Sequence, residues 1–306
     1  MPKPPQNIAV AINPRASFGR GSDLGDVVVQ TLRGAGFEVT TLIEPDGESL
    51  WRTTRDAVKG HDALVVVGGD GMAHLGVNVV AGTKTPLAIV PTGTGNDMAR
   101  GLGITIGNAE AAMRELLDAL QREPRVIDAG RIRGGAVDRW FVCIFSAGFD
   151  AVVNERANRM SWPKGRQRYN LALLRELASL KPIHYRLELD DETVDTRAML
   201  IAVANNTSFG GGMMVTPEAQ LDDGLFDVLI VQPLSRIAFL RIFPRVFKGT
   251  HVTDPRVRIV RTRRVTVSAG SARAASAAFF SARSRSCRVR CASSPRRSRA
   301  RSRPAR

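Results

Sequence analysis

The sequence has few cysteines and no long apolar run, and both shortages exclude classes of protein. Its 306 residues include 3 cysteines, Cys143, Cys287 and Cys291, which are too few and too irregularly spaced for a disulfide framework. The N-terminal apolar run is too short for a signal peptide, and no run approaches the roughly 20 residues that a membrane-spanning helix needs. We therefore expect a cytoplasmic protein that is soluble or, at most, associated peripherally with the inner face of a membrane.

Acidic residues are missing from the last part of the chain. Residues 270–306 contain 11 arginines and no Lys, Asp or Glu. The formal net charge of the whole chain is +15, and without this segment it falls to +4. A charge of +15 would suggest nucleic acid or an anionic membrane as a partner. Because most of that charge belongs to one segment, the rest of the chain gives no indication of specific nucleic-acid binding.

The same segment consists mostly of Arg, Ser, Ala and Pro, which GC-rich codons yield in any reading frame. Our hypothesis is that a frameshift replaced the native C-terminus after residue 269, so that 270–306 is a disordered or out-of-frame tail. The alternative is a selected basic tail that binds nucleic acid or an anionic membrane.

The remaining sequence changes its pattern near residue 125. Up to that point strand-like runs (7–14, 37–43, 63–67 and 87–90) alternate with helical patterns that include 47–59, 73–81 and a helix capped by Asn108. This alternation predicts a Rossmann-like α/β nucleotide-binding domain with a parallel sheet over 1–125. Strand-like runs broken by Gly, Asn and Asp dominate 126–269, which predicts a mostly antiparallel second domain.

Two glycine-rich turns follow consecutive strands of the predicted parallel sheet. The first is "GGDG" at 68–71 and the second is "TGTGND" at 92–97. Ligands of open parallel sheets bind beyond the carboxyl ends of the strands, where glycines and helix N-termini bring backbone N–H groups close to phosphate oxygens. Asp70 and Asp97 add carboxylates that suit Mg²⁺. Ordinary strand-to-helix turns are the alternative; neither a Walker A loop nor the dinucleotide fingerprint is present.

Four motifs in order carry a resemblance to a known family. "INPRAS" (12–17), "VVVGGDGMAHLGVN" (65–78), "PLAIVPTGTGNDMARGLGI" (86–104) and "LDDGLFDVLIV" (221–231) resemble the catalytic region of diacylglycerol kinases and sphingosine kinases. The resemblance covers roughly residues 6–268 and implies a nucleotide-binding α/β domain, a β-sandwich domain and a cleft between them. It also implies ATP and Mg²⁺ as cofactors.

The resemblance further implies site residues. Asp70 and Asp97 are expected to be catalytic through the magnesium network. The expected nucleotide-binding residues are Asn13, Gly68, Gly69, Asp70, Gly71, Thr92, Gly93, Thr94 and Asn96. The chain departs from the family pattern at Met72, where the family has Thr, and at His74–Leu75, where it has Asn-Glu. These changes affect the hydroxyl and carboxylate contacts of that turn and leave its glycines intact.

The acidic loop of the second domain is expected to bind a structural Mg²⁺. The resemblance implies Asp223 and backbone carbonyls near Gln220 and Leu225 as ligands. A simple β-turn is the alternative, because Asp-Gly pairs favour turns.

The resemblance implies a lipid kinase that phosphorylates diacylglycerol at a membrane surface. Alternatives are a kinase for another lipid alcohol such as a sphingoid base, an NAD kinase, or a catalytically impaired nucleotide- or lipid-binding protein. Impairment follows from the tail, because the family places its general base in a C-terminal Asp-Gly-Glu-type turn and 270–306 contains no carboxylate. A basic run with Trp162 at its centre (156–168) could dock on anionic phospholipids, although a solvated face is the simpler interpretation. A homodimer is also possible.

Overall fold

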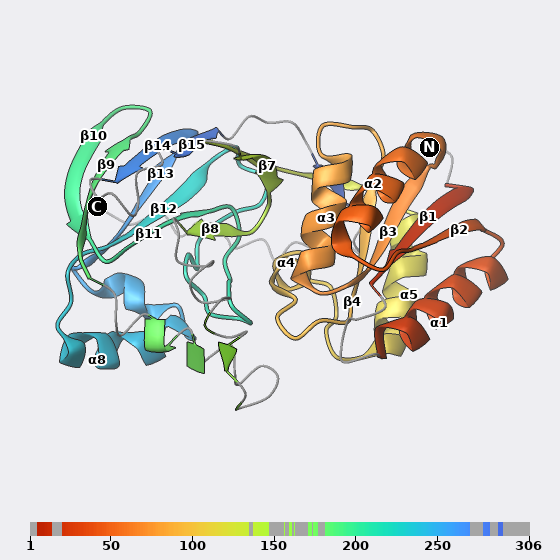
Figure 1. Cartoon of the computed structure of the whole chain (residues 1–306), viewed down its shortest axis with the longest axis horizontal. Coiled ribbons are helices and arrows are strands. Elements are labelled where there is room, and N and C mark those ends of the chain that lie inside the picture. Colours follow the sequence, from red (N-terminus) through yellow and green to blue (C-terminus); the bar gives the residue numbers. More distant parts are fainter. Residues whose placement is uncertain are drawn as a thin grey trace, which may run out of the picture.

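The computed structural model contains two domains that lie side by side (Figure 1). It describes residues 5–13, 20–134, 137–146, 181–269, 278–281 and 287–289, together with a few positions between 156 and 176. The "PRAS" part of the first motif (14–17) and most of the basic run 156–168 lie outside these residues. Within the described part of the chain no helix is long and apolar enough to cross a membrane.

The first domain is built on a six-stranded sheet of order β2-β1-β3-β4-β16-β5. Strands β1 to β4 pair in parallel, as the alternation of strands and helices predicts. Residues of β3 and β4 are buried throughout, because helices cover both faces of the sheet. The strands are β1 (Asn7–Ile12), β2 (Glu38–Ile43), β3 (Ala63–Gly68), β4 (Leu87–Pro91), β5 (Arg125–Ile127) and β16 (Cys287–Val289).

Alternate side chains of these strands enter two apolar cores. Ile8 and Val10 pack with residues of α1 and α5 on one face, whereas Ala9 and Ala11 pack with residues of α2 and α3 on the other. The predicted cap is confirmed, since Asn108 Oδ1 accepts a hydrogen bond of 3.0 Å from Ala111 N–H. The helices are α1 (Arg20–Gly34), α2 (Gly47–Ala57), α3 (Asp70–Val80), α4 (Asp97–Gly101) and α5 (Ala109–Leu120), and a 3₁₀ turn (Val58–Gly60) follows α2.

The second domain packs two antiparallel sheets against each other, which confirms the predicted fold class. The six-stranded sheet has the order β10-β9-β14-β15-β6-β7, and the four-stranded sheet has the order β13-β12-β11-β8. Their shared core includes Phe141 and Phe226, whose rings stack at 5.4 Å. The strands are β6 (Gly130–Gly134), β7 (Val137–Phe141), β8 (Ile144–Ser146), β9 (Ile183–Glu188), β10 (Thr193–Ala198), β11 (Leu200–Ala204), β12 (Phe226–Val231), β13 (Val257–Thr262), β14 (Arg264–Ala269) and β15 (Ala278–Ser281).

Helix α8 (Arg236–Val246) packs on the outer face of the four-stranded sheet and is followed by a 3₁₀ turn (Thr250–Thr253). Its Phe243 and Val246 pack against a core that contains Ala202 and Leu229 of that sheet. In Figure 1, α8 lies at the end of the second domain that is remote from α1 and α5.

The tail departs from the expectation of disorder at two places. β15 pairs antiparallel with both β14 and β6, and β16 lies between β4 and β5. For these short segments the prediction of a disordered tail is wrong, because strands whose edges are already formed offer unpaired N–H and C=O groups to any extended chain. The edges of β14 and β6 are therefore covered rather than exposed. β5, which begins at the predicted boundary between the domains, joins the first sheet.

The two strands of the tail give a test by truncation. A chain that ends at residue 269 should unfold more easily than one that ends at residue 290, because it loses the pairing of β15 and the fully buried Val289. We expect a decrease of more than about 3 kcal/mol in the free energy of unfolding, from lost hydrogen bonds and apolar burial. Denaturant unfolding of the two chains measures this. Equal stability would mean that the strands contribute nothing to the fold.

Candidate active site

The two glycine turns pack directly against each other. β3 and β4 are parallel neighbours, and Gly68 at the end of β3 pairs with Pro91 at the end of β4. A Cβ atom built on Gly69 would lie 2.9 Å from Gly93 Cα, and a Cβ atom on Gly93 would lie closer still to Gly69 Cα. Gly69 and Gly93 are therefore required where one backbone touches the other.

Asn96 closes the second turn. It is the one non-glycine residue among those described that has a positive φ, 54°. Its Oδ1 accepts a hydrogen bond of 3.0 Å from Gly93 N–H, and its Nδ2 donates one of 2.7 Å to the Gly93 carbonyl. The side chain is buried, so Asn96 holds the shape of the turn from inside.

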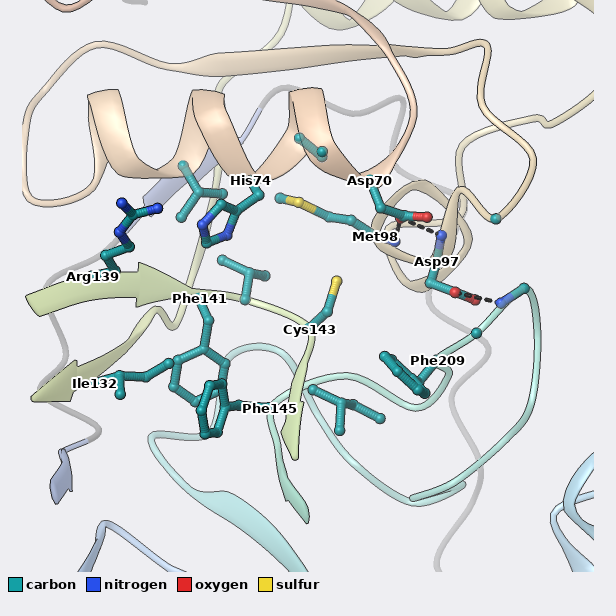
Figure 2. Close-up of a pocket in the computed structure, with 18 of the residues that line it drawn as sticks. Asp70, His74, Asp97, Met98, Ile132, Arg139, Phe141, Cys143, Phe145 and Phe209 are labelled. Atoms are coloured by element: carbon teal, nitrogen blue, oxygen red, sulfur yellow. Dashed lines mark hydrogen bonds between the residues drawn. The ribbon is translucent and has the colours of Figure 1, made fainter. Parts of the chain in front are cut away.

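Asp70 joins the first turn to the second. It is the first residue of α3, and its Oδ1 accepts hydrogen bonds from Asp97 N–H at 2.6 Å and Met98 N–H at 3.2 Å (Figure 2). Asp70 therefore occupies the N-terminus of α4, where a negative charge is favourable. Burial, and after it the charge of Asp97, raises the pKa of the Asp70 carboxyl above its usual value.

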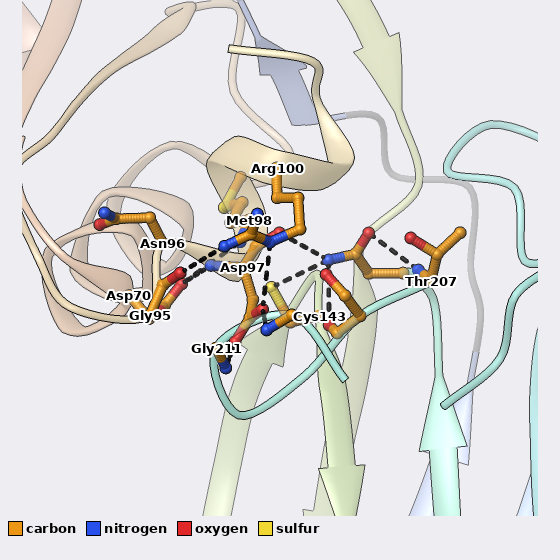
Figure 3. Close-up of polar contacts among 12 residues, drawn as sticks. Asp70, Gly95, Asn96, Asp97, Met98, Arg100, Cys143, Thr207 and Gly211 are labelled. Carbon is orange, nitrogen blue, oxygen red and sulfur yellow. Dashed lines mark hydrogen bonds and ion pairs between the residues drawn. The ribbon is translucent and has the colours of Figure 1, made fainter. Parts of the chain in front are cut away.

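Asp97 joins the first domain to the second. Its carboxylate accepts hydrogen bonds from Gly211 N–H at 2.6 Å and Gly212 N–H at 2.8 Å (Figure 3). Both glycines lie in the loop that joins β11 to β12. These glycines have φ values of 85° and 100°, which turn their N–H groups toward one point. The Asp97 carbonyl also accepts a hydrogen bond of 2.9 Å from Asn206 Nδ2. Asp97 is 5% exposed.

A cavity of about 560 Å³ opens between the domains at this junction. One end is polar and is formed by the glycine turns. The other end is mostly apolar and comes from β6 to β8 and the loop that carries Phe209, with Arg139 of β7 and His74 of α3 also lining it (Figure 2). Its polar lining includes Asp70, Gly71, Thr94, Gly95 and Asp97, and its apolar lining includes Ile132, Val137, Phe141, Ile144, Phe145 and Phe209. The predicted cleft between the domains is present.

The predicted nucleotide residues divide into two groups. Gly71 and Thr94 line the cavity, and nothing lies within 4 Å of a Cβ built on Gly71. The second group shapes the turns: Thr92 N–H donates to the Gly68 carbonyl at 2.9 Å, and Asn13 N–H donates to the Val67 carbonyl at 3.5 Å. Gly68, Gly69, Gly93 and Asn96 belong with this second group.

The two departures from the family pattern have different positions. Met72 is buried and packs in the core of the first domain. The position where the family has a threonine hydroxyl is therefore outside the cavity in this chain. His74 lines the cavity. Burial, and after it the charge of Arg139, lowers the pKa of the His74 ring, which keeps it neutral at pH 7. Cys143 also lines the cavity, and burial raises the pKa of its thiol far above the usual value.

Asp70 and Asp97 suit a divalent cation. Two carboxylates lie at one end of the cavity, and the nearest cationic group to Asp97 is Arg100, whose Nε lies 3.8 Å from Oδ1. Burial is the larger cause of the raised pKa of Asp70, and the charge of Asp97 is the second, so the two carboxylates lie close enough to interact. No cluster of three or more His, Cys, Asp or Glu side chains set to hold a metal occurs in the described parts of the chain, but the expected site uses two carboxylates.

The acidic loop lies next to a second, buried carboxylate. Asp223 Oδ1 accepts a hydrogen bond of 3.0 Å from Leu225 N–H, and its Oδ2 pairs with Arg261. Beside it Asp227 is 3% exposed, its Oδ2 has no hydrogen-bond partner among the described residues, and burial raises its pKa to about 6. The other oxygen of Asp227, Oδ1, lies 3.8 Å from Arg261 Nε, so Asp223 and Asp227 both already pair with the Arg261 guanidinium. A site built from Asp223 and carbonyls near Gln220 and Leu225 stays a prediction.

Sequence patterns could not identify the loop of residues 209–213 as the partner of Asp97. Its three consecutive glycines (210–212) show only that another group can approach the backbone closely, and do not say which group. The contact joins residues 114 positions apart, and no spacing along the chain encodes it.

A pair of glycine substitutions separates turn packing from nucleotide binding. Gly93→Ala should lower the free energy of unfolding by about 2 kcal/mol or more, because its Cβ would strike the Gly69 backbone and Asn96 Oδ1. Gly71→Ala faces open space on a helix and should leave stability unchanged or slightly higher. If Gly71 lies against the nucleotide, Gly71→Ala should nevertheless weaken ATP binding. Thermal unfolding with and without ATP and Mg²⁺ measures both effects, and destabilisation by Gly71→Ala would contradict this assignment.

Comparison with known proteins agrees with this architecture. The diacylglycerol kinase catalytic domain matches residues 7–132, and the YegS C-terminal NAD kinase beta sandwich-like domain matches residues 143–280. The second match extends past residue 269 into β15. A crystal structure of a diacylglycerol kinase from Bacillus anthracis superimposes with a TM-score of 0.69 over 95% of this chain and 98% of that chain. At 17% identity this likeness supports the fold alone.

Several proteins are more similar to this chain in sequence than the protein of that crystal structure is. A diacylglycerol kinase of Mycobacterium tuberculosis H37Rv is 38% identical over 263 residues, which is 85% of this chain and 84% of the relative. A diacylglycerol kinase of Bacillus subtilis is 27% identical over 78% of each chain. A probable lipid kinase, YegS-like, of Chromohalobacter salexigens is 30% identical over 70% of this chain and 69% of the relative. The chain therefore belongs to the diacylglycerol kinase family of lipid kinases.

Proposed function

We propose that this lipid kinase transfers the γ-phosphoryl group of ATP to the hydroxyl of diacylglycerol, which yields phosphatidic acid. The observation that supports this is one cavity with two chemically different ends. Two carboxylates and an open glycine lie at one end, and mainly aromatic and aliphatic side chains form the other, with Arg139 and His74 beside them. A phosphoryl donor and an apolar alcohol would meet between them.

The polar end suits the triphosphate of ATP. Gly71 offers a backbone that no side chain covers, and Thr94 offers a hydroxyl. Helix α3 begins at Asp70, so its N-terminus lies at this end of the cavity. Helix N-termini favour phosphate groups. Asp70 and Asp97 would hold Mg²⁺, which when bound neutralises phosphate charge and orients the γ-phosphoryl group.

The apolar end suits the glycerol and acyl parts of a lipid. Phe141, Phe145 and Phe209 line it, and bulky apolar side chains exclude water from a transferred phosphoryl group. Asp97 bonds to the loop next to Phe209, so the same residue positions the polar end and the apolar end. A sphingoid base has a comparable apolar chain and is the alternative substrate class.

The proton of the attacking hydroxyl needs an acceptor, and the cavity offers few. Asp70 and Asp97 are the carboxylates among its described lining residues, and both belong to the proposed metal site. The neutral ring of His74 also lines the cavity, but burial lowers its pKa and makes it a weak base. The last acidic residue of the sequence is Asp254, and its pairing with Arg256 lowers the pKa of its carboxyl to about 2. It is therefore a poor base. General-base assistance contributes about 10²–10⁴ in rate.

A phosphotransfer assay tests this proposal. The protein is incubated with labelled ATP and Mg²⁺ in mixed micelles that contain diacylglycerol, sphingosine or NAD as acceptor. We expect labelled phosphatidic acid at a low rate, and loss of even this product in Asp70→Asn. A chain in which the in-frame C-terminus, with its Asp-Gly-Glu-type turn, replaces 270–306 should be at least about a hundredfold faster.

Three outcomes would contradict parts of the proposal. Faster phosphorylation of sphingosine or NAD than of diacylglycerol would contradict the proposed substrate. ATP-dependent stabilisation without any product would indicate an impaired binding protein. Full activity of the unaltered chain would show that a base is present elsewhere.

A further inference from the structure

The outer face of α8 exposes large apolar side chains. Ile237 and Leu240 are 66% and 63% exposed, and Phe247, which follows the last helical turn, is 45% exposed. The opposite side of the helix is already occupied, because Ile242 and Phe243 pack toward the four-stranded sheet. α8 is therefore apolar on two sides, and only one of them is needed for the fold.

The exposed residues form one continuous stripe. Ile237, Leu240, Pro244 and Phe247 recur at intervals of three and four, which places them on the same side of a helix. At 100° per residue, Arg236 falls at one margin of this stripe and Arg241 and Lys248 fall at the other. An apolar centre between basic margins is the arrangement of helices that lie in a membrane interface.

The charge around this stripe has one sign. No acidic residue occurs between Asp227 and Asp254. Among the ion pairs of the described residues, none includes Arg236, Arg241 or Lys248. A second copy of the chain would bring the same cations against one another, whereas anionic lipid headgroups would neutralise them.

The inner side of α8 lines a second apolar cavity, of about 100 Å³, between the helix and the four-stranded sheet. This cavity shares Ile144 and Phe209 with the large cavity between the domains. One helix, about 10 Å across, thus separates the exposed stripe from the apolar interior of the site. A bilayer on the stripe would lie close to the region where a lipid is proposed to bind.

We propose that the stripe Ile237, Leu240, Pro244 and Phe247, with Arg236, Arg241 and Lys248 at its margins, docks the protein on an anionic phospholipid bilayer. The apolar side chains enter the interface and the basic side chains contact headgroups. This proposal rests on the proposed function in one respect, namely that the bilayer supplies the lipid substrate. Vesicle binding needs no phosphotransfer, so the two proposals can fail independently.

Sedimentation with vesicles tests the docking face. The full chain is mixed with phosphatidylcholine vesicles that contain 30% phosphatidylglycerol, or with phosphatidylcholine alone, at about 0.1 M salt. We expect binding to the mixed vesicles and little to the neutral ones. Ile237→Ser with Leu240→Ser should weaken binding at least about tenfold, and Arg236→Gln with Arg241→Gln about tenfold or more, with a smaller salt dependence.

Matched controls use exposed residues of the first domain. Val27→Ser changes a side chain that is 47% exposed on α1, and Arg114→Gln removes a cation on α5 that pairs with Glu110. Both should bind the mixed vesicles as the unaltered chain does. ATP with Mg²⁺ should raise the melting temperature equally in all variants, which shows that the nucleotide site is intact.

Three results would overturn the docking face. The first is failure of the unaltered chain to bind the mixed vesicles. The second is equal binding by the unaltered chain and the Ile237 and Leu240 double variant. The third is a dimer in solution that this double variant converts to a monomer, because the stripe would then be an interface between copies of the chain.

Discussion

The carboxylate of Asp97 is buried where the two domains meet, and a buried charge must be balanced by nearby donors. Here the donors are the N–H groups of Gly211 and Gly212 from the second domain. The backbone N–H of Asp97 in turn donates to Asp70 of the first glycine turn. Three loops from both domains therefore meet at one residue, whose backbone and side chain hold the walls of the cavity in place.

Much of the first domain follows from local sequence. The Val- and Ile-rich runs of β3 and β4 can only be buried, and the glycines and aspartates after them can only form turns at one edge of a parallel sheet. The close approach of Gly69 and Gly93 gives these glycines a structural role besides the expected one toward phosphate. Both roles require the same residue type, so the sequence pattern alone does not separate them.

Other features depend on contacts between distant residues, and sequence patterns predict them poorly. α8 is apolar on two sides and contains Pro244, which obscures its helical period and leaves it without a prediction. β15 and β16 lie in an Arg- and Ser-rich segment with little strand character, and they are strands because β14, β6, β4 and β5 offer edges. The bond from Asp97 to the glycine loop exists only once both domains have folded.

Amide hydrogen exchange of the loop 209–213 tests the role of Asp97 most directly. In the unaltered chain Gly211 and Gly212 should exchange slowly, because their N–H groups are bonded to a buried carboxylate. In Asp97→Ala the same amides should exchange at least about tenfold faster, while those of β3 keep their protection. Fast exchange of both glycines in the unaltered chain, or an unchanged rate in Asp97→Ala, would contradict the account.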